Sequence, residues 1–344
     1  MVIRHYSCFA LMLTLSKEKS TIIKGIVISM MLAYHLFNHA HISLCEPLLY
    51  IGDKPFISWL IKACAPVAFF MLLIGYGLAY KFSHGGLNFK SQFKRILRLY
   101  IHFWIILTLF LIIGHMIKPA DYPGSFKRIW TNFTSWSVSY NAEMWFLLPY
   151  AIISLLSLYI FKILSKCGDI KTLIATIIIN IITSYIISRY GSTLFTHHLI
   201  YNILLCFHLL VSFVTGAVLY RTSMKLNWAV PQWGIWLLII ALVTVTCITP
   251  GAVRYLLYSP LLVILLAHVK WPKYLKSILL ELGRKSMPMW MIHTWLAYYL
   301  FQPQVYALKY VPLIFIAVLV SSYIISIPIM WLADRTYQIL PKMS

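Results

Sequence analysis

The chain has 344 residues, of which 61% are hydrophobic and only 11% are charged. About a quarter of the residues in a soluble globular domain are charged, so this composition excludes a disordered protein and argues against an ordinary soluble one. Lys and Arg number 29 against 8 acidic residues, which gives a formal net charge of +21. Such an excess is typical of proteins that bind nucleic acid, an anionic substrate or a membrane, and the positions of the charges decide among these classes.

Long apolar runs recur along the chain, and many reach the roughly 17 to 25 residues that an α-helix needs to cross the ~30 Å hydrocarbon core of a bilayer. The runs lack the two-residue alternation of a barrel strand, so we predict an all-α, polytopic transmembrane helical bundle. About ten spans are expected, at residues 22–38, 56–80, 96–117, 142–164, 173–188, 199–220, 233–248, 253–269, 287–301 and 311–333.

The basic residues can be compared with the positive-inside rule, which places Lys and Arg in cytoplasmic loops. If the N-terminus is cytoplasmic, ten spans place 21 of these residues on the cytoplasmic side and 8 on the other side. We therefore predict that both termini are cytoplasmic. The topology also accounts for most of the positive charge, so the expected partner is the lipid bilayer and no nucleic acid is expected.

The N-terminal segment contains a short apolar run, residues 7–15, that follows Arg4 as in a signal peptide. A Lys-Glu-Lys sequence at 17–19 follows it in place of a small-residue cleavage site, so residues 1–20 are expected to be cytoplasmic or interfacial. Residues 21–335 are expected to form a single transmembrane domain, and residues 336–344 a short cytoplasmic tail. The six cysteines are scattered singly without metal-ligand spacing, so no metal site is expected.

Lys24 and His35 are eleven residues apart in the first expected span. Eleven residues make close to three helical turns, so both side chains lie on one helix face, about 16 Å apart along the axis. Polar residues inside a membrane are costly and are functional candidates by default. In the alternative interpretation, Lys24 is an anchor at the membrane interface and His35 is a hydrogen-bonded packing residue.

Two further charged features lie at the ends of expected spans. Arg95 and Arg98 are three residues apart at the cytoplasmic start of the third span, where two guanidiniums on one face can hold the phosphate oxygens of a ligand. The alternative is ordinary flanking charge. Glu143 lies at the outer end of the fourth span, where its carboxylate is suited to accept the proton of an imidazole and raise its basicity. It is equally suited to cap a helix or to bind Arg128.

These features form an ordered set of motifs: Lys24-x10-His35, Phe69-Phe70 followed by Gly75-Tyr76, Arg95-x-x-Arg98, the aromatic segment around Glu143, and Gly283-x-x-Ser286 leading to His293. Together, from about residue 17 to the C-terminus, they resemble the acyltransferase-3 family of bacterial integral membrane O-acyltransferases. Two positions depart from the family pattern. Lys24 stands where Arg is common, and Ile74 stands where many members carry Ser.

The resemblance implies an enzyme of the bacterial cytoplasmic membrane that takes an acyl group, usually acetyl, from cytoplasmic acyl-CoA. The group is transferred to a hydroxyl of a glycan or related envelope molecule. No permanently bound cofactor is implied, because acetyl-CoA is the donor substrate. The implied site residues are the catalytic His35 and Glu143, the donor-binding Lys24, Arg95 and Arg98, and the additional His293 and Ser286.

Physical reasoning from the residues agrees with this reaction. Acyl-CoA carries several phosphates and cannot enter lipid, so it needs a cationic receptor at the cytoplasmic mouth, for which Arg95, Arg98 and Lys24 are available. His35 is then expected to act as a general base on the acceptor hydroxyl, or to accept the acyl group itself. The alternative function is a glycan or lipid-linked sugar transporter or flippase, which also needs polar residues along a membrane pathway.

Overall fold

The computed structural model describes residues 15–38, 41–223, 230–251 and 254–339. Its secondary structure is almost entirely helical, which confirms the predicted all-α class. The helices are α1 (Lys17–Phe37), α2 (Phe56–Leu60), α3 (Pro66–Ser83), α4 (Phe89–Ile117), α5 (Phe126–Phe133), α6 (Leu147–Cys167), α7 (Asp169–Leu194), α8 (His198–Ser223), α9 (Gln232–Ile248), α10 (Tyr255–His268), α11 (Lys273–Thr294), α12 (Gln302–Tyr306) and α13 (Val311–Ile339). The shorter elements are the 3-10 helices η1 (Ile42–Leu44), η2 (Ile61–Ala63) and η3 (Ala142–Phe146), the π-helix η4 (Trp295–Tyr299), and the hairpin strands β1 (Tyr50–Ile51) and β2 (Lys54–Pro55).

Seven helical segments of the described chain are long and apolar enough to cross a membrane, which makes this a multi-pass membrane protein: Lys17–Phe37, Phe56–Ser83, Phe89–Ile117, Ala142–Cys167, Asp169–Leu194, His198–Thr222 and Val311–Ile339. They coincide with seven of the predicted spans. Two other predicted spans fall on α9 and α10, which are shorter apolar helices. The last, at 287–301, falls on the end of α11 and on η4. The total of about ten spans and the cytoplasmic termini stay predictions.

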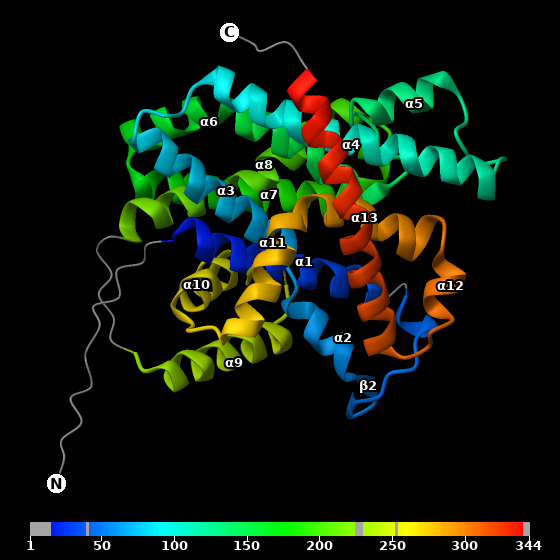
Figure 1. Cartoon of the computed structure of the whole chain (residues 1–344). Helices are drawn as coiled ribbons and strands as arrows, with labels where there is room; N and C mark the ends of the chain where they lie inside the picture. Colours follow the sequence, from blue (N-terminus) through cyan, green and yellow to red (C-terminus); the bar gives the residue numbers. More distant parts are fainter. Residues whose placement is uncertain (1–14, 39–40, 224–229, 252–253, 340–344) are drawn as a thin grey trace.

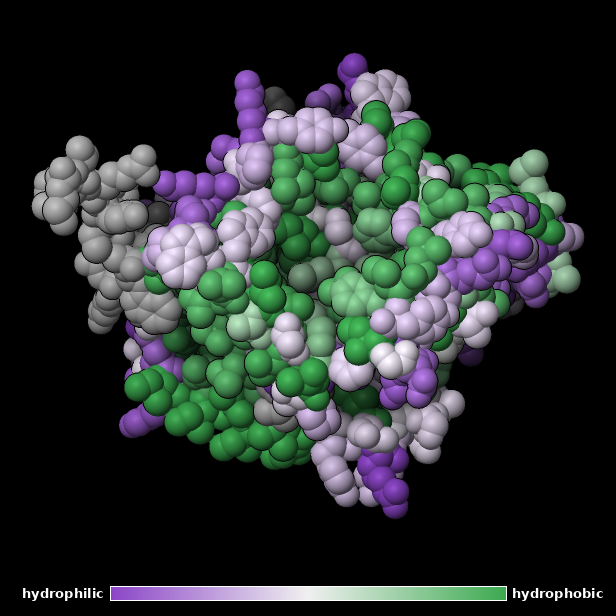
Figure 2. Space-filling model, turned by 90° about the horizontal axis from the view of Figure 1, so that it is seen from below, coloured by the Kyte–Doolittle hydropathy of each residue, from purple (hydrophilic) through white to green (hydrophobic). Residues whose placement is uncertain are grey.

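The long helices form a bundle. Figure 1 shows α1, α4, α6, α7, α8 and α9 running roughly across the view, while α3 and α13 run obliquely to them. The short elements α5, α12 and β2 gather at one end of this bundle (Figure 1). Figure 2 shows a lateral face on which hydrophobic side chains predominate and hydrophilic ones gather toward the edges, as expected for a surface in contact with lipid.

Side-chain caps fix the first residues of α1, which carries Lys24, and of α4, which carries Arg95 and Arg98. Ser16 precedes α1 and its side chain accepts a hydrogen bond from the backbone N–H of Lys19 at 3.2 Å. Asn88 precedes α4 and accepts from the N–H of Ser91 at 2.8 Å, while the Ser91 hydroxyl accepts from the N–H of Asn88 at 3.3 Å. This reciprocal capping box satisfies orphan donors at the helix start. It places Arg95 in the second turn of α4.

Glycines allow two pairs of helices to approach closely. A Cβ atom on Gly75 of α3 would lie 1.9 Å from the backbone oxygen of Phe213 in α8, and one on Gly216 would lie 2.0 Å from that of Leu72. Where α1 crosses α11, a Cβ on Gly283 would lie 1.9 Å from the backbone oxygen of Thr21. Small residues of this kind let transmembrane helices associate through direct backbone contact. The two crossings hold α1 and α3 beside the helices they pack against.

The α3–α8 crossing leads to a stability prediction. Gly75→Ala should push the two helices apart, because the added methyl group overlaps a backbone atom that cannot move independently. Overpacking of this kind costs roughly 1–3 kcal/mol. The melting temperature in detergent, followed by tryptophan fluorescence, should therefore fall. Gly77→Ala is the matched control, since a Cβ there meets nothing within 4 Å; equal melting temperatures for the two variants would show that the crossing is not tightly packed.

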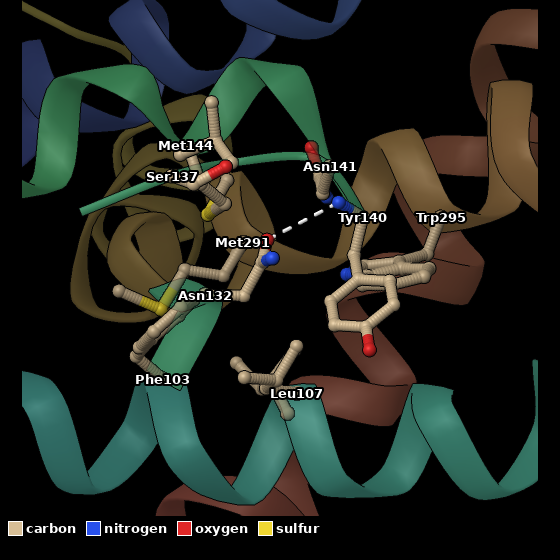
Figure 3. Close-up of a pocket in the computed structure, with 11 residues that line it drawn as sticks. Phe103, Leu107, Asn132, Ser137, Tyr140, Asn141, Met144, Met291 and Trp295 are labelled. Atoms are coloured by element: carbon tan, nitrogen blue, oxygen red, sulfur yellow. Dashed lines mark hydrogen bonds between the residues drawn. The ribbon is translucent and has the colours of Figure 1, made fainter. Parts of the chain in front are cut away.

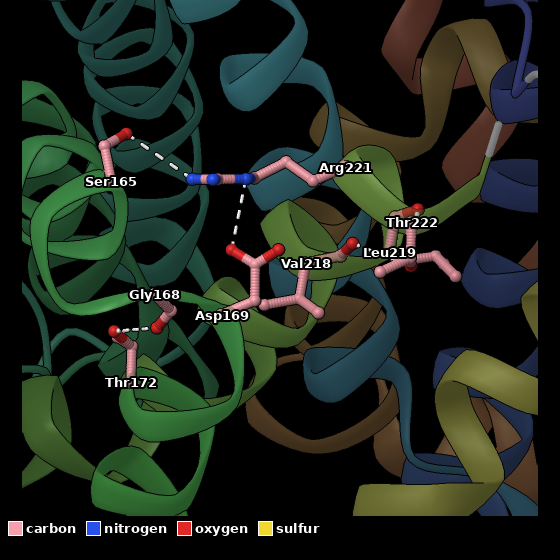
Figure 4. Close-up of polar contacts among 8 residues, drawn as sticks. All are labelled: Ser165, Gly168, Asp169, Thr172, Val218, Leu219, Arg221 and Thr222. Carbon is pink, nitrogen blue, oxygen red and sulfur yellow. Dashed lines mark hydrogen bonds and ion pairs between the residues drawn. The ribbon is translucent and has the colours of Figure 1, made fainter. Parts of the chain in front are cut away.

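An ion pair joins α7 and α8 where α7 begins. Arg221 Nε lies 3.1 Å from the Asp169 carboxylate, and a terminal nitrogen of Arg221 donates to the Ser165 hydroxyl at 3.4 Å (Figure 4). Asp169 is the first residue of α7, where a negative charge is favourable to the helix dipole. Arg221 thus links the end of α8 to the turn between α6 and α7.

Candidate active site

The helices α1 and α11 carry the central candidates on facing sides. Lys24 lines a cavity together with Ser286 of α11, while His35 contacts His293 of the same helix. Both side chains of α1 therefore face α11, in agreement with their eleven-residue spacing. Lys24 and His35 lie at different depths along α1. The helix α11 packs against α1 at both depths, with Ser286 beside Lys24 and His293 beside His35.

His35 and His293 form a contact between two imidazole rings. Their centroids are 5.2 Å apart and the rings are tilted by 51°. His293 is completely buried, and its Nδ1 lies 2.8 Å from the Trp290 carbonyl oxygen and 3.2 Å from that of Met289. A carbonyl only accepts hydrogen bonds, so Nδ1 carries the proton and Nε2 is left as an acceptor. Nε2 is buried and has no hydrogen-bond partner among the described residues.

Glu143 is held by a tyrosine. One of its carboxylate oxygens accepts a hydrogen bond from the Tyr299 hydroxyl at 2.7 Å, and the same hydroxyl accepts from the backbone N–H of Ala142 at 2.9 Å. The adjacent Tyr298 donates its hydroxyl to the backbone carbonyl of His35. The sequence left an imidazole, a helix cap and Arg128 open as partners of Glu143, and the side-chain bond found in this structure is to a phenol. Glu143 is connected to the His35 region through the two consecutive tyrosines.

The two tyrosines belong to the π-helix η4, which directly follows α11. Single π-helical turns are rare and occur frequently at functional sites. Tyr298 also stacks on His41, with ring centroids 4.1 Å apart and nearly parallel planes. Burial lowers the pKa of His41 below its ordinary value of 6.5, so the stacked ring is neutral at pH 7. The loop that follows α1 is thereby packed against the same turn.

A cavity of about 130 Å³ lies between Lys24 and Ser286. Most of its wall is apolar, and its lining residues are Lys24, Phe70, Ile74, Leu99, Phe146, Tyr150, Ser286, Met287 and Trp290. The Ser286 hydroxyl donates to the Gly283 carbonyl at 2.9 Å. Ile74, at the position that departs from the family pattern, contributes an apolar wall. The cavity is therefore largely apolar, with the cationic side chain of Lys24 in its wall.

The two arginines of α4 occupy different environments. The Arg95 guanidinium lies 5.6 Å from the ring centroid of Tyr150, which lines the cavity, and two of its nitrogens are buried without a hydrogen-bond partner among the described residues. Arg98 is half exposed and forms an ion pair with Asp334 of α13. The structure does not bring the two guanidiniums together into one fork. Arg95 belongs to the cavity region, and Arg98 links α4 to α13.

The loop before η3 is fixed by polar side chains against the end of α11. The Thr294 hydroxyl donates to the Asn141 side-chain oxygen at 3.0 Å. The backbone N–H of Tyr140 donates to the side-chain oxygen of Asn132 at 3.2 Å (Figure 3). Asn132, Tyr140 and Asn141 help to line a cavity of only about 10 Å³, which has room for one water at most. The loop is therefore rigidly packed and holds Glu143, two residues after Asn141, in place.

Sequence reasoning did not identify Tyr298, Tyr299 or Thr294. They follow His293 in a run of aromatic and apolar residues that is also typical of a membrane-interface belt. Only the π-helical turn, which no pattern of apolar residues predicts, places the two tyrosines between Glu143 and His35. The one available signal was the pair of adjacent tyrosines five and six residues after the candidate His293.

The profile of one protein family, described as Acyltransferase domain and known as acyltransferase-3, matches residues 19–331. The match covers most of the chain and includes all seven candidate residues. No curated protein and no solved structure matches the chain.

Proposed function

Because this chain belongs to the acyltransferase-3 family, it is an acyltransferase, and we propose that it transfers an acyl group, acetyl in the simplest case, from acyl-CoA to a hydroxyl of an envelope glycan. The proposal places the protein in the bacterial cytoplasmic membrane with both termini in the cytoplasm. It assigns donor binding to the end of the site at Lys24 and Arg95, and acyl transfer to the end at His35.

The main support for the proposal is that α1 and α4 place the positive charges of Lys24 and Arg95 at one end of the site, beside α11. The buried guanidinium nitrogens of Arg95, which have no hydrogen-bond partner among the described residues, are strong donors for an anion, because an unsatisfied buried donor carries a desolvation cost. The phosphates of acyl-CoA supply such an anion. The largely apolar cavity beyond Lys24 suits the acyl end of the donor, and α11 continues from Ser286 to His293.

Transfer requires the acceptor hydroxyl to lose its proton while its oxygen attacks the thioester carbon. In our proposal His35 takes that proton, the carbon–sulfur bond breaks, and the leaving CoA thiolate receives the proton from the His35 imidazolium. In the same proposal, His35 turns its other N–H toward the unprotonated Nε2 of His293, which has no partner among the described residues, and this new hydrogen bond would fix the His35 tautomer. His293 is in this account a positioning residue, and transfer through an acyl-histidine at His35 is the competing route.

This role of His293 leads to a prediction. His293→Leu removes the acceptor and should lower kcat roughly 10- to 100-fold, the equivalent of a hydrogen bond to a charged group, while the KM for acyl-CoA stays unchanged. His293→Gln places a side-chain oxygen close to the position of Nε2 and should restore much of kcat. Steady-state kinetics on the two purified variants provides the measurement. Equal kcat values for His293→Gln and His293→Leu would show that His293 contributes only packing.

A second prediction concerns the bond between Tyr299 and Glu143. Tyr299→Phe leaves the carboxylate without its phenol donor and should reduce kcat about tenfold. Glu143→Gln, which still accepts from Tyr299, should reduce kcat by a similar amount if the charge of Glu143 is what matters. A double-mutant cycle on kcat measures the coupling. Additive losses would mean that the two residues act independently, contrary to this arrangement.

The proposed function is tested by mass spectrometry of envelope glycans from cells with and without the gene. One acyl ester should be absent from the glycans of the deleted strain and should return when the wild-type gene is restored. Glycans of identical mass in both strains, with a change in a lipid or a small metabolite instead, would contradict the glycan acceptor.

A further inference from the structure

Four helices leave an apolar groove on the side of the molecule where α9 lies. Its volume is about 270 Å³, and only apolar surface lines it. The lining residues come from α1, α9, α10, α11 and the turn before α11: Ile26, Met30, Trp236, Ile239, Val243, Leu262, Leu266, Trp271, Leu275 and Leu279. Protein interiors rarely leave spaces larger than a water molecule, so a groove of this size requires an apolar filling.

The groove opens sideways, toward the lipid. Trp236 and Leu275 line it and are 40% and 39% exposed. Figure 2, which views the molecule from below, shows hydrophobic side chains around a hollow near the middle of this face. Ile26 and Met30 are on the opposite side of α1 from the face that carries His35, because five residues turn a helix through about 500°. The groove is therefore separate from the candidate active site.

Basic residues surround one end of the groove. Trp236 and Trp271 pack edge to face there, with ring centroids 5.6 Å apart. Lys270 immediately precedes Trp271, and its backbone N–H donates to Gln232, one turn before Trp236, at 2.8 Å. Lys19 lies two helical turns before Ile26 on the same face of α1.

Lys273 begins α11 at this end. The only acidic side chain that the described residues place there, Glu18, is already paired with Lys276 at 2.8 Å. Lys19, Lys270 and Lys273 form no ion pair among the described residues. This end of the groove therefore carries excess positive charge.

We propose that the groove binds one acyl chain of an anionic phospholipid, whose phosphate lies against Lys19, Lys270 and Lys273. An acyl chain supplies the apolar filling between α1 and α9, and the lysines select the head group. Lysines next to a membrane surface each favour anionic lipid by about fivefold. The amphipathic lysine stems extend over the apolar surface while their ammonium groups meet the phosphate.

The test reconstitutes the full chain in bilayers that contain a trace of spin-labelled phosphatidylglycerol or, separately, spin-labelled phosphatidylcholine. The motionally restricted fraction of each label is measured by electron paramagnetic resonance. The wild type should restrict phosphatidylglycerol at least about fivefold more strongly than phosphatidylcholine. Equal restriction of the two lipids would overturn the proposal.

Two variants separate the parts of the groove. Val243→Trp fills it and should abolish the strongly restricted component, whereas Leu237→Trp, on a different and 57% exposed face of α9, should retain it. Replacing the three lysines by Gln should remove the preference for phosphatidylglycerol without disturbing the helices. The proposal would also be overturned if both Val243→Trp and the variant with three Gln residues kept the preference for phosphatidylglycerol. This result does not depend on the acyltransferase activity of the variants.

Discussion

His35→Ala abolishes acyl transfer while the amount of folded protein in the membrane stays normal. General base catalysis contributes about 10²- to 10⁴-fold to rate, and the variant loses both the base and the imidazole that His293 contacts. The His35 ring is at the end of α1 and makes no side-chain hydrogen bond that supports the fold among the described residues, so little stability should be lost. The rate of CoA release from acetyl-CoA, measured on purified protein, provides the readout.

Two controls make this result specific. Replacing Met30, on the other face of α1, by Ala tests whether any truncation of this helix stops transfer, and it should leave the rate within a few fold. Melting temperatures of the variants exclude unfolding as the cause. If His35→Ala retains a rate within tenfold of the wild type, His35 is neither the general base nor the acyl carrier, and the mechanism proposed above is wrong.

Arg95→Ala raises the KM for acyl-CoA by roughly 10- to 100-fold, because the variant loses charge-assisted hydrogen bonds to the donor phosphates. Arg98→Ala raises it much less. Arg98 is half exposed and paired with Asp334, and exposed ion pairs contribute only about 0.2–1 kcal/mol. KM values for acetyl-CoA, measured side by side on the two variants, give the comparison.

Asp334→Asn is the matched control for Arg98. It removes the partner of Arg98 and leaves the guanidinium free. If Arg98 mainly links α4 to α13, both Arg98→Ala and Asp334→Asn should lower the melting temperature slightly and change KM only a little. An equal rise in KM for Arg95→Ala and Arg98→Ala would contradict separate roles for the two arginines. It would support the sequence-based prediction that both guanidiniums bind the donor phosphates together.

The sequence was informative where apolar runs are long and where motifs are local. The all-α class follows from runs such as 56–80 and 311–333, because only a helix satisfies the backbone in lipid over such a length. The family could be recognised from motifs whose members lie within one helix or a few residues of one another, such as Lys24 with His35. A helix has a fixed rise and turn per residue, so spacing within it predicts a shared face.

The partners of the candidate residues could not be predicted, because they depend on contacts between distant segments. Arg98 pairs with Asp334, which is 236 residues away in the sequence, and this pairing distinguishes Arg98 from Arg95. Glu143 binds Tyr299 because a π-helical turn follows α11. The free Nε2 of His293 results from a bond between its Nδ1 and its own helix. None of these has a signature in residue spacing.

The count of about ten spans stays a prediction, and the expected span that falls on α11 differs most from the observed helices. The expected span at 287–301 begins within α11, and just before it Glu281 forms ion pairs with both Arg284 and Lys285. These charges keep α11 below the hydropathy of a typical membrane-crossing helix, although its second half is buried in the bundle. A hydropathy pattern reports contact with lipid, and α11 is instead surrounded largely by protein.

Acyl transfer from acyl-CoA to a glycan is tested in sealed vesicles that contain the purified protein, supplied with acetyl-CoA and with envelope glycan extracted from cells that lack the gene. Released CoA and glycan-bound acetyl ester are quantified together over time. The account predicts one CoA released for each ester formed by the wild type, and neither product from His35→Ala. Glycan that crosses the vesicle membrane without release of CoA would contradict it and would identify the protein as a transporter.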